Sequence, residues 1–353
     1  MTSALRHPAR HWVAVAAGAT ALTMALAACG GQAKASGDPS DGSTGAAGGG
    51  GKVGIVAFSV PKPAYDALET AFQATPDGKG VTFSASYGPS GSQSKAVAAG
   101  QPADYVGFSV GPDLTRLVPD TVDAGWDSGA TKGIVSSSVV VIVVRKGNPK
   151  HITGWDDLVK PGVQIVTPSP ATSGSAKWNI LAAYEHVIAE GGTEDQAAAY
   201  LTSFYKNIVS KPDSGANATT TFTAGTGDAL ISYENEAIAA RQKGADVDYV
   251  VPTESFLIEN PGAVTKSASP AAARFLQFVE SADGQKIFAS KGFRPVGGIV
   301  EPGTVEGAAD PSNPFPKVAK LTTIDSLGGW ATVDKKFFDK TDGLVTKIEA
   351  SVG

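Results

Sequence analysis

From Val53 onward, the chain alternates short apolar stretches with segments whose apolar residues recur at helical spacing. The apolar stretches are rich in β-branched residues and predict strands at residues 52–60, 80–88, 103–109, 134–149, 162–168 and 247–252. The intervening periodic segments predict helices at residues 65–74, 92–99, 176–189, 196–206, 271–278 and 285–291, and residues 227–237 predict a strand that runs into a helix. This alternation is typical of α/β architecture.

The length of the chain favours more than one packed unit. It has 353 residues, of which 42% are apolar, and this suits two domains better than one. The Val139–Val144 run and the segment 248–266 are the places where we expect the chain to cross between two lobes. These crossings predict the following parts: lobe one at residues 53–140 plus 260–325, lobe two at 141–259, and a C-terminal segment of helical character at 326–353.

The first 28 residues have the pattern of an export signal. Arg6 and Arg10 give the positive start, Trp12–Ala28 gives an apolar core, and small residues end it. This core is shorter than the roughly 20 residues that a membrane-spanning helix needs. Residues 29–52 are mostly Gly, Ala and Ser and predict a flexible tether with a reach of roughly 25–30 Å.

The single cysteine, Cys29, follows the apolar core in the sequence LAACG. This stretch resembles the lipobox of bacterial lipoproteins, in which the cysteine becomes the lipid-bearing N-terminus after cleavage. The resemblance implies an extracytoplasmic protein anchored to the cell membrane through a lipid on Cys29. A chain with one cysteine has neither an intrachain disulfide nor a cysteine-based metal site.

The charge of the chain excludes several classes of partner. Removing residues 1–28 takes away two arginines and no acidic residue, so the formal charge changes from −5 to −7. A negative balance argues against nucleic acid or anionic lipid as a partner, although local groups can still bind a small anion. Two of the four histidines lie in the signal, and His151 and His186 lack a metal-ligand spacing, so we predict no metal site.

Three segments place small residues at the start of a predicted helix. They read GPSGSQSK from Gly88, TSGSAKW from Thr172, and DSGANATT from Asp213, where we expect the helix to begin near Thr219. The first N–H groups of a helix have no internal partner and bind anions, aided by the helix dipole. The alternative is that all three are ordinary helices capped by Ser or Thr.

One helix terminus is too weak to hold a ligand. Micromolar affinity needs about 8 kcal/mol, whereas a hydrogen bond to a charged group contributes roughly 1.5–3 kcal/mol. Four or five good donors are therefore required. Three termini that converge from two lobes would supply that number.

Several stretches are similar to the sulfate/thiosulfate-binding proteins of bacterial ABC importers. They are RKGNPKHITGWDDLVKPGVQIVTPSPATSGSAKWNILAAY, DSGANATTTFTAGTGDALISYENEA and KGFRPV, and the similarity extends over nearly all of residues 53–350. It implies a type II periplasmic-binding-protein fold, with two α/β lobes that close around a dehydrated tetrahedral oxyanion in the cleft between them. It also implies a monomeric receptor without cofactor or enzymatic activity, which delivers sulfate or thiosulfate to the permease subunits of the importer.

The resemblance also implies a set of site residues. The family holds its ligand with backbone N–H groups, serine hydroxyls and one aromatic N–H. Matched by motif, the implied ligand-binding residues are Ser90, Gly91, Ser173, Gly174, Ser175, Ala216 and Tyr233. Lys177 stands where the family usually carries an arginine behind the ligand-contacting residues.

The sequence departs from the family pattern at three of these positions and at the first strand. Tyr233 replaces a tryptophan, Ser175 replaces a glycine, and Lys177 replaces the arginine. Tyrosine still donates an O–H, and Ser175 either crowds the anion or adds a donor. The first strand ends in FSVPKPAY, whereas the family often carries Ser-Tyr-Asp-Pro, so an acidic residue that orders the site is missing.

A pocket made of donors alone distinguishes sulfate from phosphate. Sulfate carries no proton at neutral pH, whereas phosphate carries at least one, and burying that proton without an acceptor is costly. We expect no Asp or Glu to contact the ligand and place Asp213 and Glu234 at the surface or behind the site.

Three other functions are compatible with parts of the sequence. The segment Ser92–Lys95 fits the S-x-x-K pattern of penicillin-recognising serine enzymes, but no K-T-G follows it. A binding protein for molybdate, tungstate or phosphate would have a similar architecture. An adhesin or scaffold with a vestigial pocket is the third.

Overall fold

The computed structural model describes residues 50–352. The predicted signal peptide, residues 29–49 of the predicted tether and Cys29 lie outside this range. All described residues belong to one unit, residues 47–353, and the description concerns that unit alone. Between residues 50 and 352, none of the helices has the length and apolar character that crossing a membrane requires.

The fold is mixed α/β, as the alternating pattern predicts. The strands are β1 (Gly51–Phe58), β2 (Val81–Gly88), β3 (Tyr105–Gly107), β4 (Ile134–Arg145), β5 (Ile165–Val166), β6 (Ile208–Ser210), β7 (Ala229–Tyr233), β8 (Val247–Val250), β9 (Glu254–Val264) and β10 (Lys320–Thr322). The helices are α1 (Lys62–Gln73), α2 (Ser90–Ala98), α3 (Gly111–Thr115), α4 (Gly174–Ala189), α5 (Glu194–Lys206), α6 (Gly215–Thr223), α7 (Glu234–Gln242), α8 (Pro270–Glu280), α9 (Ala282–Ser290), α10 (Trp330–Val333) and α11 (Leu344–Val352).

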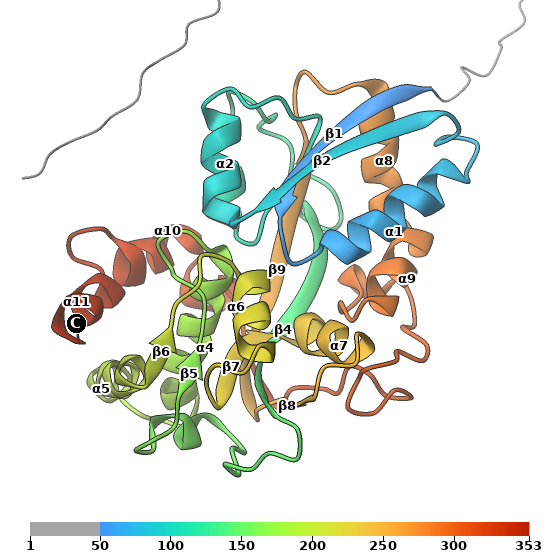
Figure 1. The fold of residues 1–353 in the computed structure, drawn as a ribbon. Coiled ribbons are helices and arrows are strands. Elements are labelled where there is room, and N and C mark those ends of the chain that lie inside the picture. Colours follow the sequence, from blue (N-terminus) through green and yellow to red (C-terminus); the bar gives the residue numbers. More distant parts are fainter. Residues whose placement is uncertain (1–49, 353) are drawn as a thin grey trace, which may run out of the picture. The chain divides into compact units, whose positions relative to one another are not determined.

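The strands form two groups that are joined by β4 and β9. In the group that we call lobe one, β1 pairs in parallel with β2 and β3, and helices α1, α2, α3, α8 and α9 accompany these strands. In the group that we call lobe two, β5 pairs in parallel with β6 and β7, and helices α4 to α7 accompany them. Figure 1 shows the two groups, with β4 and β9 running between them.

The pairing of β4 and β9 shows how the lobes are connected. Residues 262–264 of β9 pair with β3, and residues 257–261 pair with the first half of β4. From Val140 onward, β4 instead pairs with β7 and β8. The two strands thus continue from one group into the other, while the lobe limits at residues 140 and 260 stay predictions.

The core follows the apolar runs of the sequence. Val139–Val144 is a continuous apolar run, and each of its side chains is at most 2% exposed. A strand that is covered on both faces has this composition, because no position faces water. The run therefore explains why β4 lies in the middle of the sheet.

Three elements differ from the sequence prediction. Helix α6 begins at Gly215, four residues before the predicted start. Residues 254–264 form a long strand, although they contain Pro261 and Gly262. The C-terminal segment is not continuously helical, because α10 leads through a π-turn at Asp334–Phe338 to a gap before α11.

Candidate functional site

The starts of α4 and α6 differ in how they are capped. Ser214 caps α6, since its hydroxyl accepts a hydrogen bond from the N–H of Asn217 at 3.2 Å. Ser173 occupies the N-cap of α4, but its hydroxyl makes no capping bond within residues 50–352. The interpretation as an ordinary capped helix therefore holds for α6 and fails for α4. Because Ser173 is only 3% exposed, its hydroxyl is a buried donor without a capping role.

Lobe one contacts these helix starts directly. The N–H of Gly91 in α2 donates to the carbonyl of Thr172, two residues before α4, at 3.1 Å. Gly174 lies against Ser109, because a Cβ added at Gly174 would stand 2.7 Å from the Ser109 Cβ. The structure thus brings Gly91 and Gly174 to the boundary between the lobes, although the Gly91 amide is already paired.

The start of α6 lies beside the start of α4. A Cβ added at Gly215 would stand 3.0 Å from the Ser175 Oγ and 3.1 Å from a methyl group of Val60. Val60 follows β1 in lobe one, whereas Ser175 and Gly215 belong to lobe two. In the first turns of α4 and α6, the N–H groups of residues such as Ser175 and Ala216 have no intrahelical acceptor. Donors of two helices therefore meet next to a loop of the opposite lobe.

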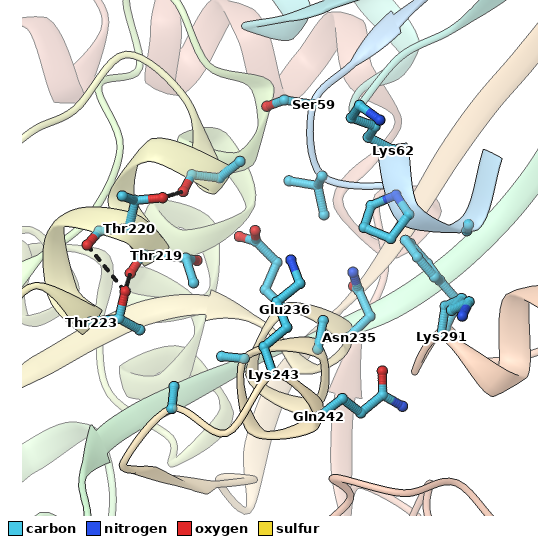
Figure 2. A pocket seen from close by; sticks show the side chains of 18 residues that line it. Ser59, Lys62, Thr219, Thr220, Thr223, Asn235, Glu236, Gln242, Lys243 and Lys291 are labelled. Carbon is cyan, nitrogen blue, oxygen red and sulfur yellow. Dashed lines mark hydrogen bonds between the residues drawn. The ribbon is translucent and has the colours of Figure 1, made fainter. Parts of the chain in front are cut away.

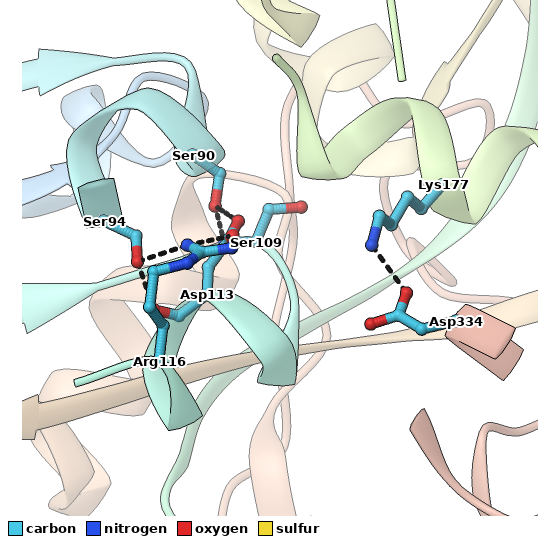
Figure 3. Close-up of polar contacts among 7 residues, drawn as sticks. All are labelled: Ser90, Ser94, Ser109, Asp113, Arg116, Lys177 and Asp334. Atoms are coloured by element: carbon cyan, nitrogen blue, oxygen red, sulfur yellow. Dashed lines mark hydrogen bonds and ion pairs between the residues drawn. The ribbon is translucent and has the colours of Figure 1, made fainter. Parts of the chain in front are cut away.

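A chain of buried hydroxyl groups connects the lobes, and Figure 3 shows its two members from lobe one, Ser90 and Ser109. Ser90 Oγ accepts a hydrogen bond from the N–H of Ser109 at 3.0 Å. Ser109 Oγ lies 2.7 Å from the hydroxyl oxygen of Tyr233, which ends β7 in lobe two. Ser109 and Tyr233 are 0% exposed and Ser90 is 2% exposed. The predicted site residues Ser90 and Tyr233 are thus joined through Ser109, which the sequence analysis missed.

The environment of Tyr233 keeps its phenol neutral. Burial raises the pKa of Tyr233, and hydrogen bonds with Ser109, Ser175 and Asn260 lower it by less. A neutral phenol retains its proton and donates one hydrogen bond. A neutral Tyr233 thus has a proton to donate, and its donation to the ligand stays a prediction.

An aspartate that the sequence analysis also missed contacts Ser90. Ser90 Oγ donates to a carboxylate oxygen of Asp113 in α3 at 2.6 Å. Arg116 pairs with the other oxygen of Asp113 at 2.9 Å, and both pairings are visible in Figure 3. The position of Asp113 four residues after Ser109, just beyond a predicted strand, was the available signal. Asp113 is 5% exposed, whereas its partner Arg116 stays partly exposed.

A pocket of about 580 Å³ opens beside the start of α6. Val60, Ala216 and Glu236 line it, and Figure 2 shows Lys62, Lys243 and Lys291 around it. Burial raises the pKa of Glu236 to about 7, while hydrogen bonds with Ser232 and Thr219 oppose this.

Two acidic residues near the site differ in their surroundings. Asp213 is exposed, as expected. Glu234, in contrast, is 0% exposed and pairs with Arg294 at 2.7 Å, so it does not lie at the surface, and the other expected position, behind the site, stays a prediction.

Lys177 extends away from the helix starts toward the C-terminal segment. Its ammonium group pairs with Asp334 at 2.6 Å, as Figure 3 shows, and lies 4.8 Å from the ring centre of Phe338. Lys177 also lines a second pocket, of about 380 Å³, together with Ser173 and Gly174. Lys177 thus contacts the π-helix that follows α10. Its role behind the ligand-contacting residues stays a prediction.

Two other sequence features can now be located. Ser92 and Lys95, the S-x-x-K pair, are both exposed on α2. His186 lies near Asp156 and Glu190, with one potential ligand atom of each within 4.8 Å of the others. Glu190 directly follows α4, four residues after His186, and this spacing was a signal that the sequence analysis did not use.

Comparison with known proteins gives consistent matches. Residues 53–294 match the family model described as bacterial extracellular solute-binding protein. The chain is 38% identical to a sulfate-binding protein of Synechococcus elongatus over 97% of each chain. It is 32% identical to a thiosulfate-binding protein of Pseudomonas aeruginosa, over 80% of this chain and 88% of the relative.

A solved structure is similar over most of the fold. The sulfate-binding protein SubI from Mycobacterium tuberculosis H37Rv superposes with a TM-score of 0.75 and 45% sequence identity. The match covers 82% of this chain and 99% of that protein.

Proposed function

The chain belongs to the bacterial extracellular solute-binding proteins, and we propose that it binds sulfate between its two lobes and delivers it to the permease of an ABC importer. The proposal is supported by relatives and a structural neighbour that are named sulfate-binding or thiosulfate-binding proteins. Its extracytoplasmic location follows from the family.

The observation that carries the proposal is the meeting of uncharged donors from both lobes. Ser173, the Tyr233 hydroxyl and the first amides of α4 and α6 contribute from lobe two, and Ser109 lies against Gly174 and Tyr233 from lobe one. Four or five such donors at roughly 1.5–3 kcal/mol each are enough for micromolar affinity. None of the proposed ligand-binding residues is a lysine or arginine, so the anion is held by hydrogen bonds and helix dipoles.

The same arrangement favours sulfate over protonated oxyanions. A phosphate that retains a proton needs an acceptor, and its burial without one costs several kcal/mol. The nearby carboxylate of Asp113 already accepts from Ser90 and pairs with Arg116. Sulfate has no proton to place, so a pocket of donors satisfies it.

We further propose that the protein is a monomeric lipoprotein attached through Cys29, without cofactor or catalytic activity. The support is the LAACG sequence for the lipid, and the exposure of Ser92 and Lys95 against an S-x-x-K active site. Metabolic labelling with a fatty acid tests the anchor. The Cys29→Ser protein must lose the label and leave the membrane fraction.

The experiment that tests the function is calorimetric titration of the mature protein with sulfate, thiosulfate, molybdate and phosphate. We expect one sulfate per chain with a Kd in the micromolar range or tighter. A hundredfold excess of phosphate must leave sulfate binding intact. Absence of sulfate binding, or strong competition by phosphate, would contradict the proposal.

A further inference from the structure

We propose that Ser109 is a positioning residue of the binding site, which orients the Tyr233 hydroxyl so that it donates its proton to the bound anion. The inference rests on the proposed function, because it concerns the same site. Ser109 is not among the residues that the motifs indicate, and it emerges from counting the protons of the buried hydroxyl chain.

Ser90 is the first residue of this chain of buried hydroxyl groups. A serine hydroxyl has one proton to donate. Ser90 donates to one oxygen of the Asp113 carboxylate at 2.6 Å, and Arg116 pairs with the other oxygen at 2.9 Å. The proton of Ser90 is therefore committed inside lobe one. Another hydroxyl has to supply the donor that the motif comparison assigns to Ser90.

Hydrogen bonds of its backbone fix the position of Ser109. Its N–H donates to Ser90 Oγ at 3.0 Å. Its carbonyl accepts from the indole N–H of Trp178 and from the side-chain amide of Asn260, each at 2.9 Å. Three bonds to three different elements hold this residue, so its Oγ is placed rigidly on Tyr233.

The last contact in the chain joins Ser109 and Tyr233. Ser109 Oγ and the Tyr233 hydroxyl lie 2.7 Å apart and share one hydrogen bond, so one of their two protons remains for another acceptor. Either oxygen can donate within this pair. In the proposed arrangement, Ser109 donates to the phenol oxygen, so that Tyr233 keeps its own proton for the anion at the helix starts.

The geometry around Gly174 places the pair at the anion. Gly174 is the first residue of α4, and a Cβ added there would stand 2.8 Å from Ser109 Oγ. Since the N–H groups of this helix start are proposed anion donors, Ser109 and Tyr233 lie beside them. Uncharged buried donors around an anion lose little energy to reorganisation when they are already oriented.

The test is a double-mutant cycle on sulfate binding. Ser109→Ala, Tyr233→Phe and the double variant are titrated with sulfate by calorimetry, next to the wild type. Each single change must raise the Kd for sulfate by about tenfold or more. The Kd of the double variant must exceed that of Tyr233→Phe alone by no more than about twofold. Ser109→Cys, which retains a weak donor, must fall between wild type and Ser109→Ala.

A matched control separates positioning from loss of packing. Ser255→Ala removes another buried serine hydroxyl, which donates to the Val140 carbonyl on the neighbouring strand, and must leave Kd unchanged. Urea unfolding without sulfate shows that each variant is folded. Wild-type affinity in Ser109→Ala, or effects that multiply in the double variant, would overturn the inference. Absence of sulfate binding to the wild type would instead overturn the proposed function.

Discussion

Gly174→Ala tests whether the two lobes need to touch at the start of α4 for the anion to bind. The added methyl carbon would stand 2.7 Å from the Ser109 Cβ, 2.8 Å from its Oγ and 3.2 Å from a methyl group of Val110. Carbon atoms in contact lie about 3.5–4.0 Å apart, so the 2.7 Å distance to the Ser109 Cβ is short by about 0.8–1.3 Å, and the two surfaces have to separate.

The neighbour of Gly174 is unable to move aside. Ser109 is fixed by hydrogen bonds with Ser90, Trp178, Asn260 and Tyr233. The strain of overpacking a rigid site is about 1–3 kcal/mol, which corresponds to an increase in Kd of about 5-fold to 150-fold. Opening the lobes removes the strain, so its cost falls on the closed, ligand-bound form.

The stability of the ligand-free protein should respond differently. Gly174 adopts ordinary helical geometry, and alanine is more favourable than glycine in a helix by about 1 kcal/mol or less. We therefore expect the thermal midpoint without sulfate to stay the same or rise, while calorimetry shows weaker sulfate binding. Gly154→Ala is the matched control, because a Cβ there meets nothing within 4 Å. Wild-type sulfate affinity in Gly174→Ala would refute the reasoning.

Three further predictions follow from other contacts. Ser173→Ala should weaken sulfate binding by roughly 1–3 kcal/mol and leave urea stability nearly unchanged, because this hydroxyl does not cap α4; equal losses in both measurements would contradict it. Arg294→Ala should lower the unfolding free energy by about 3–5 kcal/mol in urea titrations, because it leaves the buried Glu234 carboxylate without its partner; a loss below 1 kcal/mol would be inconsistent with this. A hydrogen bond with Lys160 lowers the pKa of Asp157 to about 2, below its unfolded value of about 3.9. The stabilisation by the ionised Asp157 is thus complete above pH 4 and is lost as the pH falls toward 2. Urea unfolding of wild type and Asp157→Asn from pH 6 to pH 2 should therefore show a stability difference that shrinks as the pH falls.

The sequence predicted those elements whose signals are local. The β-branched run within residues 134–149 predicted a strand, and β4 is that strand. The start of α6 was placed too late because Gly215 and Asn217, in its first turn, are weak helix formers. The cap by Ser214 and the packing of Ala218 and Phe222 in the core determine where this helix begins.

Strand β9 illustrates a tertiary effect that local signals hide. Pro261 and Gly262 lie inside it, and both residues usually mark a break in a strand. Pro261 pairs with Ile134 and Gly262 with Gly107, at the point where β9 changes its partner from β4 to β3. The exchange of partners explains why two strand-breaking residues are accommodated there.

The candidate site was predictable as a set of loops but not as a network. The Ser-Gly motifs marked the starts of α2, α4 and α6, because each is a contiguous pattern of small residues. Ser109 and Tyr233 are 124 positions apart, and their contact exists only when the lobes are folded against each other. No local sequence pattern encodes such a pair, so the hydrogen-bond partners of these hydroxyl groups are seen only in the structure.

The pairing of Asp113 explains how a carboxylate is compatible with a site for a dianion. An ionised carboxylate near a second anion raises the energy of both, by an amount that depends on the local dielectric. Arg116 lies 2.9 Å from Asp113, and its cationic charge offsets this repulsion while the Ser90 hydroxyl satisfies the other oxygen. The negative charge thus serves to orient Ser90, whose oxygen in turn accepts from Ser109 and fixes the hydroxyl pair. In this arrangement, the charged pair sets the direction of the hydrogen bonds, and the proposed donors to the anion are neutral groups.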